Sequence, residues 1–389
     1  MNVKEIISLI PDSILEDLAL ETNVNKYSKK LKGEVIFKLL LHCILSYKDN
    51  SLRRMESNFE SIIFTYWNKK NDDAKSIRFS SISERLKTMN PLYFQNLFSK
   101  CIEIYSSYFE KKNQNLIRYD STIVSLSTKL LHVGYNLKNG DAANLNLVKY
   151  SIGLSEIPTI AHIYTEQSST SENRSLGKTI LEHETKDKQI IRIFDRGVNA
   201  RNTYDELIDK HIPFISRTNV NCKHKIIEKS TISPIQTSTL NILSDEKVYL
   251  YSEKSIARHP IRLIKATQQN AGNDPIWFIS SMDDLTAPEI CELYKRRWDI
   301  EVFFKFLKQE LNFSHFVNRS RNGIEIILYA TLIASILLLV YKKTNDIKGY
   351  KIMKQRFLHE LEWEIMKEIV IICNGDISKL EKLRQKPPD

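Results

Sequence analysis

Between residues 116 and 218, short segments rich in β-branched residues alternate with segments of helical periodicity. Strand-like patterns occupy residues 116–127, 148–154, 158–167, 188–197 and 212–218, and helical patterns occupy residues 171–183 and 203–210. The pattern at 188–197 has the near-continuous apolar run of a buried strand. This order of strands and helices predicts an α/β fold with a mixed sheet covered by helices.

The other segments of the chain have different patterns. Its 389 residues are many for a single compact core, so two or three structural units are expected. We expect an N-terminal helical domain at 1–114, the two parts of the α/β core at 115–219 and 285–345, an inserted antiparallel β unit at 220–284 and a helical tail at 346–389. The N-terminal domain fits DNA binding or a packing role. Ser51 in this domain and Thr286 at the start of the second part of the core are candidate N-caps.

Charge and cysteine content bear on partners and compartment. The 57 Lys and Arg residues against 47 Asp and Glu leave a net charge of +10, which favours a polyanionic partner such as nucleic acid. The five cysteines include no C-x-x-C pair, and the first residues lack the pattern of a secretory signal. A cytoplasmic protein without a disulfide framework or a structural zinc site is expected.

Residues 324–341 form an apolar segment of eighteen residues with one charge, Glu325. Its length lies at the lower limit for a membrane span, so a membrane protein is one alternative. Because the segment stands alone between polar regions, we favour a buried helix that packs behind the helix at 293–312. No membrane partner is expected.

Residues 293–312 are predicted to form one long helix. At about 100° per residue, Tyr294, Arg297, Glu301 and Lys308 fall within roughly 60° of one another. The neighbouring apolar residues, Trp298 and Val302 among them, are expected to bury most of the remaining surface. A carboxylate among aromatic residues is either ion-paired or a metal ligand, so an Arg297–Glu301 pair and a metal site both remain open.

Two aspartates lie in positions that suit a functional site. Asp120 lies within the first strand, on the polar face with Arg118, and Asp195 ends a buried strand, where open α/β sheets place ligands. A turn cap for Asp120 and an Asx turn for Asp195 are the structural alternatives. With Glu301 they supply the hard oxygen ligands that two Mg²⁺ ions need for phosphoryl transfer.

These residues resemble a known family. The spacing of Tyr294, Arg297, Glu301 and Lys308 is similar to the Y-R-E-K signature of DDE-type bacterial insertion-sequence transposases, in the insertion-sequence-four family. Asp120-Ser121-Thr122 and Asp195-Arg196-Gly197 resemble its two aspartate motifs, and the segment ending at Arg217 resembles the strand that follows the second. Val198 departs from the aromatic residue common after D-R-G. The resemblance covers residues 116–335.

The resemblance implies a ribonuclease-H-like catalytic core interrupted by a β-rich insertion. Asp120, Asp195 and Glu301 would be the catalytic carboxylates that bind two Mg²⁺ ions, with Mn²⁺ as a substitute. The remaining signature residues, together with Arg217, would contact DNA. Expected partners are double-stranded DNA with terminal inverted repeats, target DNA and a second copy of the chain on paired ends, at the nucleoid.

Trp277 occupies the place where related enzymes carry a tryptophan that stacks on an extruded base during hairpin formation. Such stacking is worth about 1–3 kcal/mol, although a tryptophan in a strand also serves simply to pack. The resulting expectation is a cut-and-paste DNA transposase. A nuclease on the same core and a catalytically inactive DNA-binding relic or regulator are the alternatives.

Overall fold

The computed structural model describes residues 1–46, 50–68, 76–109, 116–126, 135–136, 146–185, 187–230, 234–252, 256–269, 274–313, 317–318 and 320–383. The chain divides into two compact units. The sheet unit comprises Lys111–Phe304, and the helical unit comprises Met1–Glu110 together with Lys305–Asp389.

The sheet unit contains a large mixed sheet, which fits the predicted α/β class. Its described strands are β1 (Leu116–Leu126), β2 (Tyr135–Asn136), β3 (Asn146–Leu154), β4 (Pro158–Tyr164), β5 (Ile191–Phe194), β6 (Phe214–Thr218), β7 (His224–Ser230), β8 (Ile235–Gln236), β9 (Leu240–Leu250), β10 (Ile261–Gln268) and β11 (Pro275–Ser280). They are joined in the order β2-β3-β1-β5-β6-β11-β10-β9-β7, with β4 on β3 and β8 on β9.

The strands β7 to β11, from the region predicted to be an insertion, continue this sheet. β1, β5 and β6 are parallel, and β11 then pairs antiparallel with β6, with Phe278 opposite Arg217. The next pairs, β11 with β10, β10 with β9 and β9 with β7, are also antiparallel, as the sequence predicts. Pairing with β6 covers a strand edge that would otherwise expose unpaired backbone groups.

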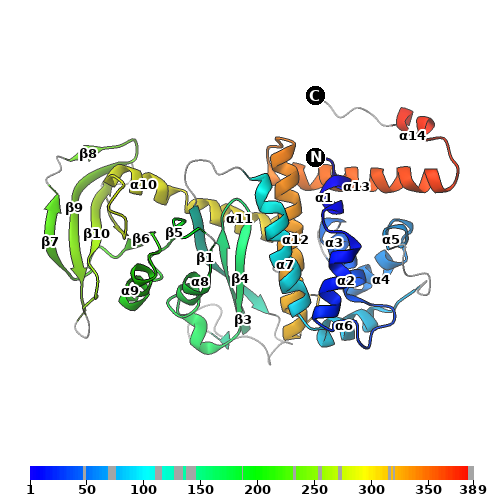
Figure 1. Ribbon diagram of the computed structural model, residues 1–389, viewed down its shortest axis with the longest axis horizontal. Helices are drawn as coiled ribbons and strands as arrows, with labels where there is room; N and C mark the ends of the chain where they lie inside the picture. Colours follow the sequence, from blue (N-terminus) through cyan, green and yellow to red (C-terminus); the bar gives the residue numbers. More distant parts are fainter. Residues whose placement is uncertain are drawn as a thin grey trace. The chain divides into compact units, whose positions relative to one another are not determined.

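Helices cover both faces of the parallel strands (Figure 1). The helices α8 (Leu176–Glu182) and α9 (Arg201–Asp209) pack on one face, in a core that includes Tyr119 and Phe194. α10 (Ala287–Lys295) packs on the other face, in a core that includes Ile193 and Ile215. Because side chains alternate along each strand, neighbouring residues of β1 and β5 point towards different helices.

Capping explains where α10 begins. Thr286 and Glu289 form a capping box, and Pro288 lies in the first turn, where its missing N–H leaves no bond unmade. The predicted N-cap is confirmed. α10 is followed by α11 (Trp298–Glu310), and the division between the two units falls within α11.

The helical unit has these described helices: α1 (Val3–Ser8), α2 (Asp12–Glu21), α3 (Gly33–Ser46), α4 (Leu52–Phe59), α5 (Ile62–Trp67), α6 (Phe79–Thr88), α7 (Leu92–Tyr105), α12 (Arg321–Thr344), α13 (Tyr350–Ile372) and α14 (Ile377–Leu383), with the short 3₁₀ helix η1 (Ser106–Tyr108) after α7. Ser51 caps α4 by accepting a hydrogen bond from the N–H of Arg54, as predicted.

The apolar segment predicted at 324–341 lies in α12. The helix packs mainly against α7 and α3, and 94% of its most apolar eighteen-residue window is buried within the protein. The ring of Tyr329 lies 5.7 Å from that of Phe98 on α7. α12 is therefore a core helix of the helical unit and not a membrane span, and the membrane alternative is wrong.

Candidate active site

Asp120 lies within β1, and Asp195 directly follows the neighbouring parallel strand β5. Arg118 of β1 is paired with Ile193 of β5. Two residues further along each strand direction come Asp120 and Asp195, so their side chains point to the same face of the sheet, the face covered by α10. Long-range pairing of β1 and β5 therefore brings together two carboxylates that are far apart in the sequence.

Arg297 connects Asp120 with Glu301. Its Nη1 lies 3.7 Å from Oδ2 of Asp120, and its Nη2 donates a hydrogen bond to Oε1 of Glu301. The predicted Arg297–Glu301 ion pair is confirmed, and it belongs to a larger group that includes a strand-borne aspartate. With 14% of its side chain exposed, Arg297 is shielded enough for both contacts to matter electrostatically.

Tyr294 lies between Asp195 and this group, since the guanidinium of Arg297 is 5.9 Å from the centroid of its ring. Its hydroxyl donates a hydrogen bond of 3.0 Å to Oδ1 of Asp195, while its ring packs edge-on against Phe278 at 5.2 Å. Burial raises the pKa of Tyr294, and the negative charge of Asp195 raises it further. The phenol therefore remains protonated and acts as a donor to Asp195.

The single helix predicted at 293–312 is wrong, because α10 ends at Lys295 and α11 begins at Trp298. The N–H groups of Arg297 and Asp299 donate to carbonyls three residues earlier, which tightens the chain into a turn. Arg118 holds this turn, since its Nε donates to the carbonyl of Arg296 at 3.1 Å and its Nη2 lies 3.0 Å from Asp299. Tyr294 and Glu301 thus approach the aspartates from two helices.

The predicted burial around this segment is also partly wrong. Trp298 is 61% exposed and Val302 is 37% exposed, and both lie on α11, after the turn that ends α10. Lys308 lies on α11, seven residues after Glu301 and on the same side of the helix, within the part that belongs to the helical unit.

Glu172 is a further carboxylate beside the site. Its Oε2 accepts a hydrogen bond of 3.1 Å from Ser121, the neighbour of Asp120, and its Oε1 lies 2.9 Å from Nζ of the buried Lys149. No local motif indicates a role for Glu172, which lies in the segment 171–183 that the sequence predicts to be helical. That prediction is wrong at its start: α8 begins at Leu176, and the residues before it form turns.

The electrostatics of Asp120 reflect this crowding. Burial raises its pKa to about 6, and the negative charges of Glu172 and Glu301 act in the same direction. The N–H of Ser121, which donates to Oδ1 at 2.7 Å, and the charge of Arg297 oppose the rise. Asp120 therefore lies where additional positive charge is favourable.

The donor set fits a hard divalent cation. Carboxylate oxygens are the ligands that Mg²⁺ prefers. Arg297 joins Asp120 and Glu301, and Tyr294 binds Asp195. Among the described residues, no three His, Cys, Asp or Glu side chains converge closely enough to hold an ion as they stand. Instead, a guanidinium lies between Asp120 and Glu301, in the place where a cation is electrostatically favoured.

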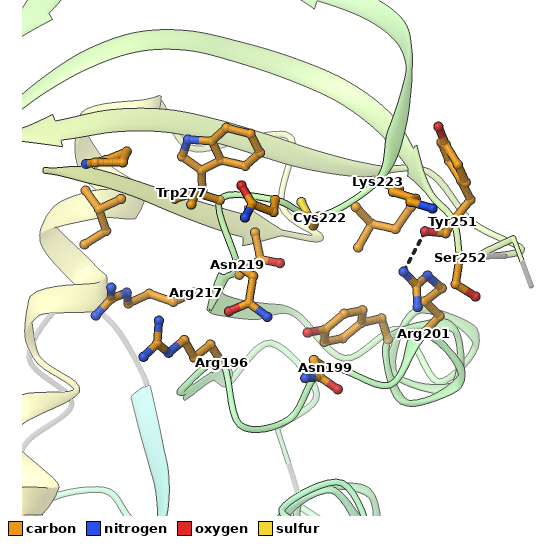
Figure 2. Close-up of a pocket in the computed structure, with 17 residues that line it drawn as sticks. Arg196, Asn199, Arg201, Arg217, Asn219, Cys222, Lys223, Tyr251, Ser252 and Trp277 are labelled. Carbon is orange, nitrogen blue, oxygen red and sulfur yellow. Dashed lines mark hydrogen bonds between the residues drawn. The ribbon is translucent and has the colours of Figure 1, made fainter.

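Trp277 and Arg217 line a cavity of about 770 Å³ beside β11 and β6 (Figure 2). Arg196, which follows Asp195, lines the same cavity, so the cavity begins next to the D-R-G motif. The indole of Trp277 packs edge-on against His224 at 5.7 Å and lies under Nζ of Lys265 at 5.0 Å. The Nε atom of Arg217 is buried without a hydrogen-bond partner within the described part of the chain.

The chain is similar in sequence to known transposases. Residues 154–337 match a family described as "Transposase DDE domain", a segment that contains Asp195 and Glu301 and begins after Asp120. The chain is 28% identical over 155 residues to "Putative transposase y4zB" of Sinorhizobium fredii, covering 40% of this chain and 43% of the relative. It is 24% identical over 152 residues to "Probable transposase for insertion sequence element IS5377" of Geobacillus stearothermophilus, covering 39% of each.

A shorter match concerns "Putative transposase for insertion sequence element IS4SA" of Synechocystis, with 35% identity over 57 residues, or 15% of this chain and 17% of the relative. The chain thus spans less than half the length of each of these curated relatives. The family match and the names of the relatives agree with the motifs around Asp195 and Glu301. The chain is accordingly similar to DDE-type insertion-sequence transposases, and the resemblance drawn from its motifs is confirmed.

Proposed function

We propose that this chain is a cut-and-paste DNA transposase with a ribonuclease-H-like core, which binds terminal inverted repeats as a dimer on paired ends. One observation carries the proposal: Asp120 within β1 and Asp195 just after β5 lie on one face of the sheet, where Tyr294 binds Asp195 and Arg297 contacts both Asp120 and Glu301. The match to a DDE transposase domain and the net charge of +10 support the same function.

Asp120, Asp195 and Glu301 would hold two Mg²⁺ ions, or Mn²⁺ in their place. When bound, such ions supply an activated water or 3′-hydroxyl and stabilise the leaving oxygen of the phosphodiester. Tyr294 keeps Asp195 oriented through its hydroxyl, and Arg297 is available to exchange its carboxylate contacts for a phosphate oxygen of the DNA. Lys308 would contact a phosphate of the DNA, as the resemblance to the signature implies.

The cavity beside Trp277 suits an extruded base. Its volume of about 770 Å³ exceeds that of a nucleobase, and Trp277 offers an aromatic face while Arg196 and Arg217 offer donors to the adjoining phosphates (Figure 2). Hairpin formation at the cleaved end requires such an extruded base. The cavity therefore supports release of the second strand through a hairpin intermediate.

The carboxylates provide the test of the proposed function. In purified protein with Mg²⁺ and DNA that carries the flanking inverted repeats, we expect cleavage and strand transfer. Asp120→Asn, Asp195→Asn and Glu301→Gln should each lower both rates at least about a hundredfold, since each loses several kcal/mol of transition-state stabilisation.

Matched controls are Asp209→Asn and Glu182→Gln, which change carboxylates that pair with Arg258 and Lys178 at the surface. Both controls should retain the wild-type rates. Normal joining by one of the three site variants would remove that residue from the active site. Cleavage without joining by the wild type would favour a nuclease, and DNA binding without cleavage would favour an inactive regulator.

A further inference from the structure

The side chain of Glu172 contacts Ser121, just after Asp120, and packs against Gly197, shortly after Asp195. Its Oε2 accepts a hydrogen bond from Ser121, the residue after Asp120. On its other side lies Gly197, two residues after Asp195: a Cβ at Gly197 would come within 2.9 Å of Cγ of Glu172. The glycine therefore permits the loop after Asp195 to pack directly on the aliphatic part of Glu172.

Lys149 fixes the orientation of Glu172. Its side chain is 1% exposed, and its Nζ contacts Oε1 of Glu172 at 2.9 Å, the carbonyl of Thr170 at 2.7 Å and Oγ of Ser175 at 3.3 Å. A buried ammonium needs such a set of acceptors. Of these three acceptors, only Glu172 carries a negative charge. Glu172 itself is 33% exposed, so without Lys149 its carboxylate could turn towards water and leave Ser121.

Asn173 strengthens the same connection. Its Oδ1 accepts hydrogen bonds from the N–H groups of Asn199 at 2.7 Å and Ala200 at 2.8 Å. Residues 172 and 173 thus hold the loop that runs from Asp195 to the start of α9. This loop begins at Asp195, so Glu172 and Asn173 hold it close to the strand that carries Asp120.

We propose that Glu172, oriented by Lys149, is a positioning residue that holds the loop after Asp195 against the strand of Asp120. This role rests on the proposed function, because Glu172 would position Asp120 and Asp195, two of the carboxylates that would bind the metal ions. Groups that orient metal ligands typically change metal affinity or activity by about 10- to 100-fold when they are removed.

Mn²⁺ binding tests the proposal without requiring catalysis. With free Mn²⁺ followed by electron paramagnetic resonance, Glu172→Ala should weaken Mn²⁺ binding by about 10- to 100-fold. Glu172→Gln should be affected less, because the amide still reaches Ser121 and still packs on Gly197. Asp120→Asn identifies the site, since it should abolish the same binding.

Lys149→Met separates positioning from simple charge. Removal of a nearby positive charge alone would tighten Mn²⁺ binding, whereas loss of the group that orients Glu172 should weaken it. We expect weaker binding, with the thermal unfolding temperature recorded to show that the protein remains folded. The matched control is Lys178→Met, at a lysine that is 59% exposed and pairs with Glu182, and it should bind Mn²⁺ as the wild type does.

Tighter Mn²⁺ binding by Lys149→Met, or unchanged binding by Glu172→Ala, would overturn the positioning role. DNA cleavage is measured on the same proteins, so the two hypotheses can fail separately. If the wild type does not cleave DNA, the proposed function fails while Mn²⁺ binding still decides the role of Glu172. If the wild type cleaves DNA and the Glu172 variants match it in rate and Mn²⁺ affinity, only the positioning role fails.

Discussion

Arg297 shows which contacts a sequence predicts and which it does not. Its pairing with Glu301 follows from a spacing of four residues, and the structure contains it. Its contact with Asp120 depends on how β1 lies relative to α10 and α11, which no local pattern specifies. No local pattern predicts the contact between Glu172 and Lys149 either, because Glu172 lies in a turn, Lys149 lies on β3 and neither belongs to a motif.

At Trp277, packing and stacking make different predictions. The indole contacts His224 and Lys265, and it also lines the cavity with Arg217, so it can offer a face to an extruded base (Figure 2). We predict that Trp277→Ala still nicks the first strand but forms hairpins about 5- to 150-fold more slowly, which corresponds to a stacking energy of about 1–3 kcal/mol. Gel analysis of nicked and hairpin products measures the two steps separately.

Trp277→Phe is the control, since it preserves an aromatic face and should recover most of the hairpin formation. The unfolding temperature of both variants shows whether packing has changed. If Trp277→Ala forms hairpins at the wild-type rate, the base-stacking role is wrong and Trp277 serves only to pack.

At the scale of helices and strands, local patterns predicted most elements but not where they break or join. Residue type predicted the caps at Ser51 and Thr286. The patterns of apolar residues predicted the strands β1 and β5. The turn between α10 and α11 contains neither glycine nor proline, so the sequence carries no local stop signal there. Tertiary bonds from Arg118 hold it instead.

Arg118 of β1 should therefore contribute more to stability than Arg296, which lies in the turn itself. Its side chain is 2% exposed and satisfies the carbonyls of Arg296 and Ser155. Arg118→Met should lower the free energy of unfolding by about 3 kcal/mol, because it removes the hydrogen bonds to the carbonyls of Arg296 and Ser155 and breaks the pair with Asp299. Chemical denaturation, with the slope compared between variants, measures the change.

The matched substitution is Arg296→Met. Arg296 is 44% exposed, and its guanidinium lies 3.6 Å from Glu156 and 3.7 Å from Asp299, so its loss should cost no more than about 1 kcal/mol. Equal effects of the two substitutions would show that Arg118 does not hold the turn.

At the scale of the whole molecule, residues distant in sequence build each unit. The helical unit joins Met1–Glu110 with Lys305–Asp389, and within it the N-terminal helices α3 and α7 pack on α12. Hydropathy identified an apolar helix at 324–341 but could not distinguish a membrane span from a core helix, because both bury the same residues away from water. The partner helices decide the matter, and they lie more than two hundred residues earlier in the chain.

The core role of α12 predicts how the protein responds to a cavity. Leu337 is fully buried, so Leu337→Ala should lower the free energy of unfolding by about 2–5 kcal/mol. Ile371→Ala on α13, where the side chain is 53% exposed, should change it by less than about 1 kcal/mol. Both are measured by denaturation in buffer without detergent. A Leu337→Ala protein as stable as the wild type would contradict the packing of α12, since a well-packed apolar site cannot lose three carbon atoms without forfeiting both burial and contacts.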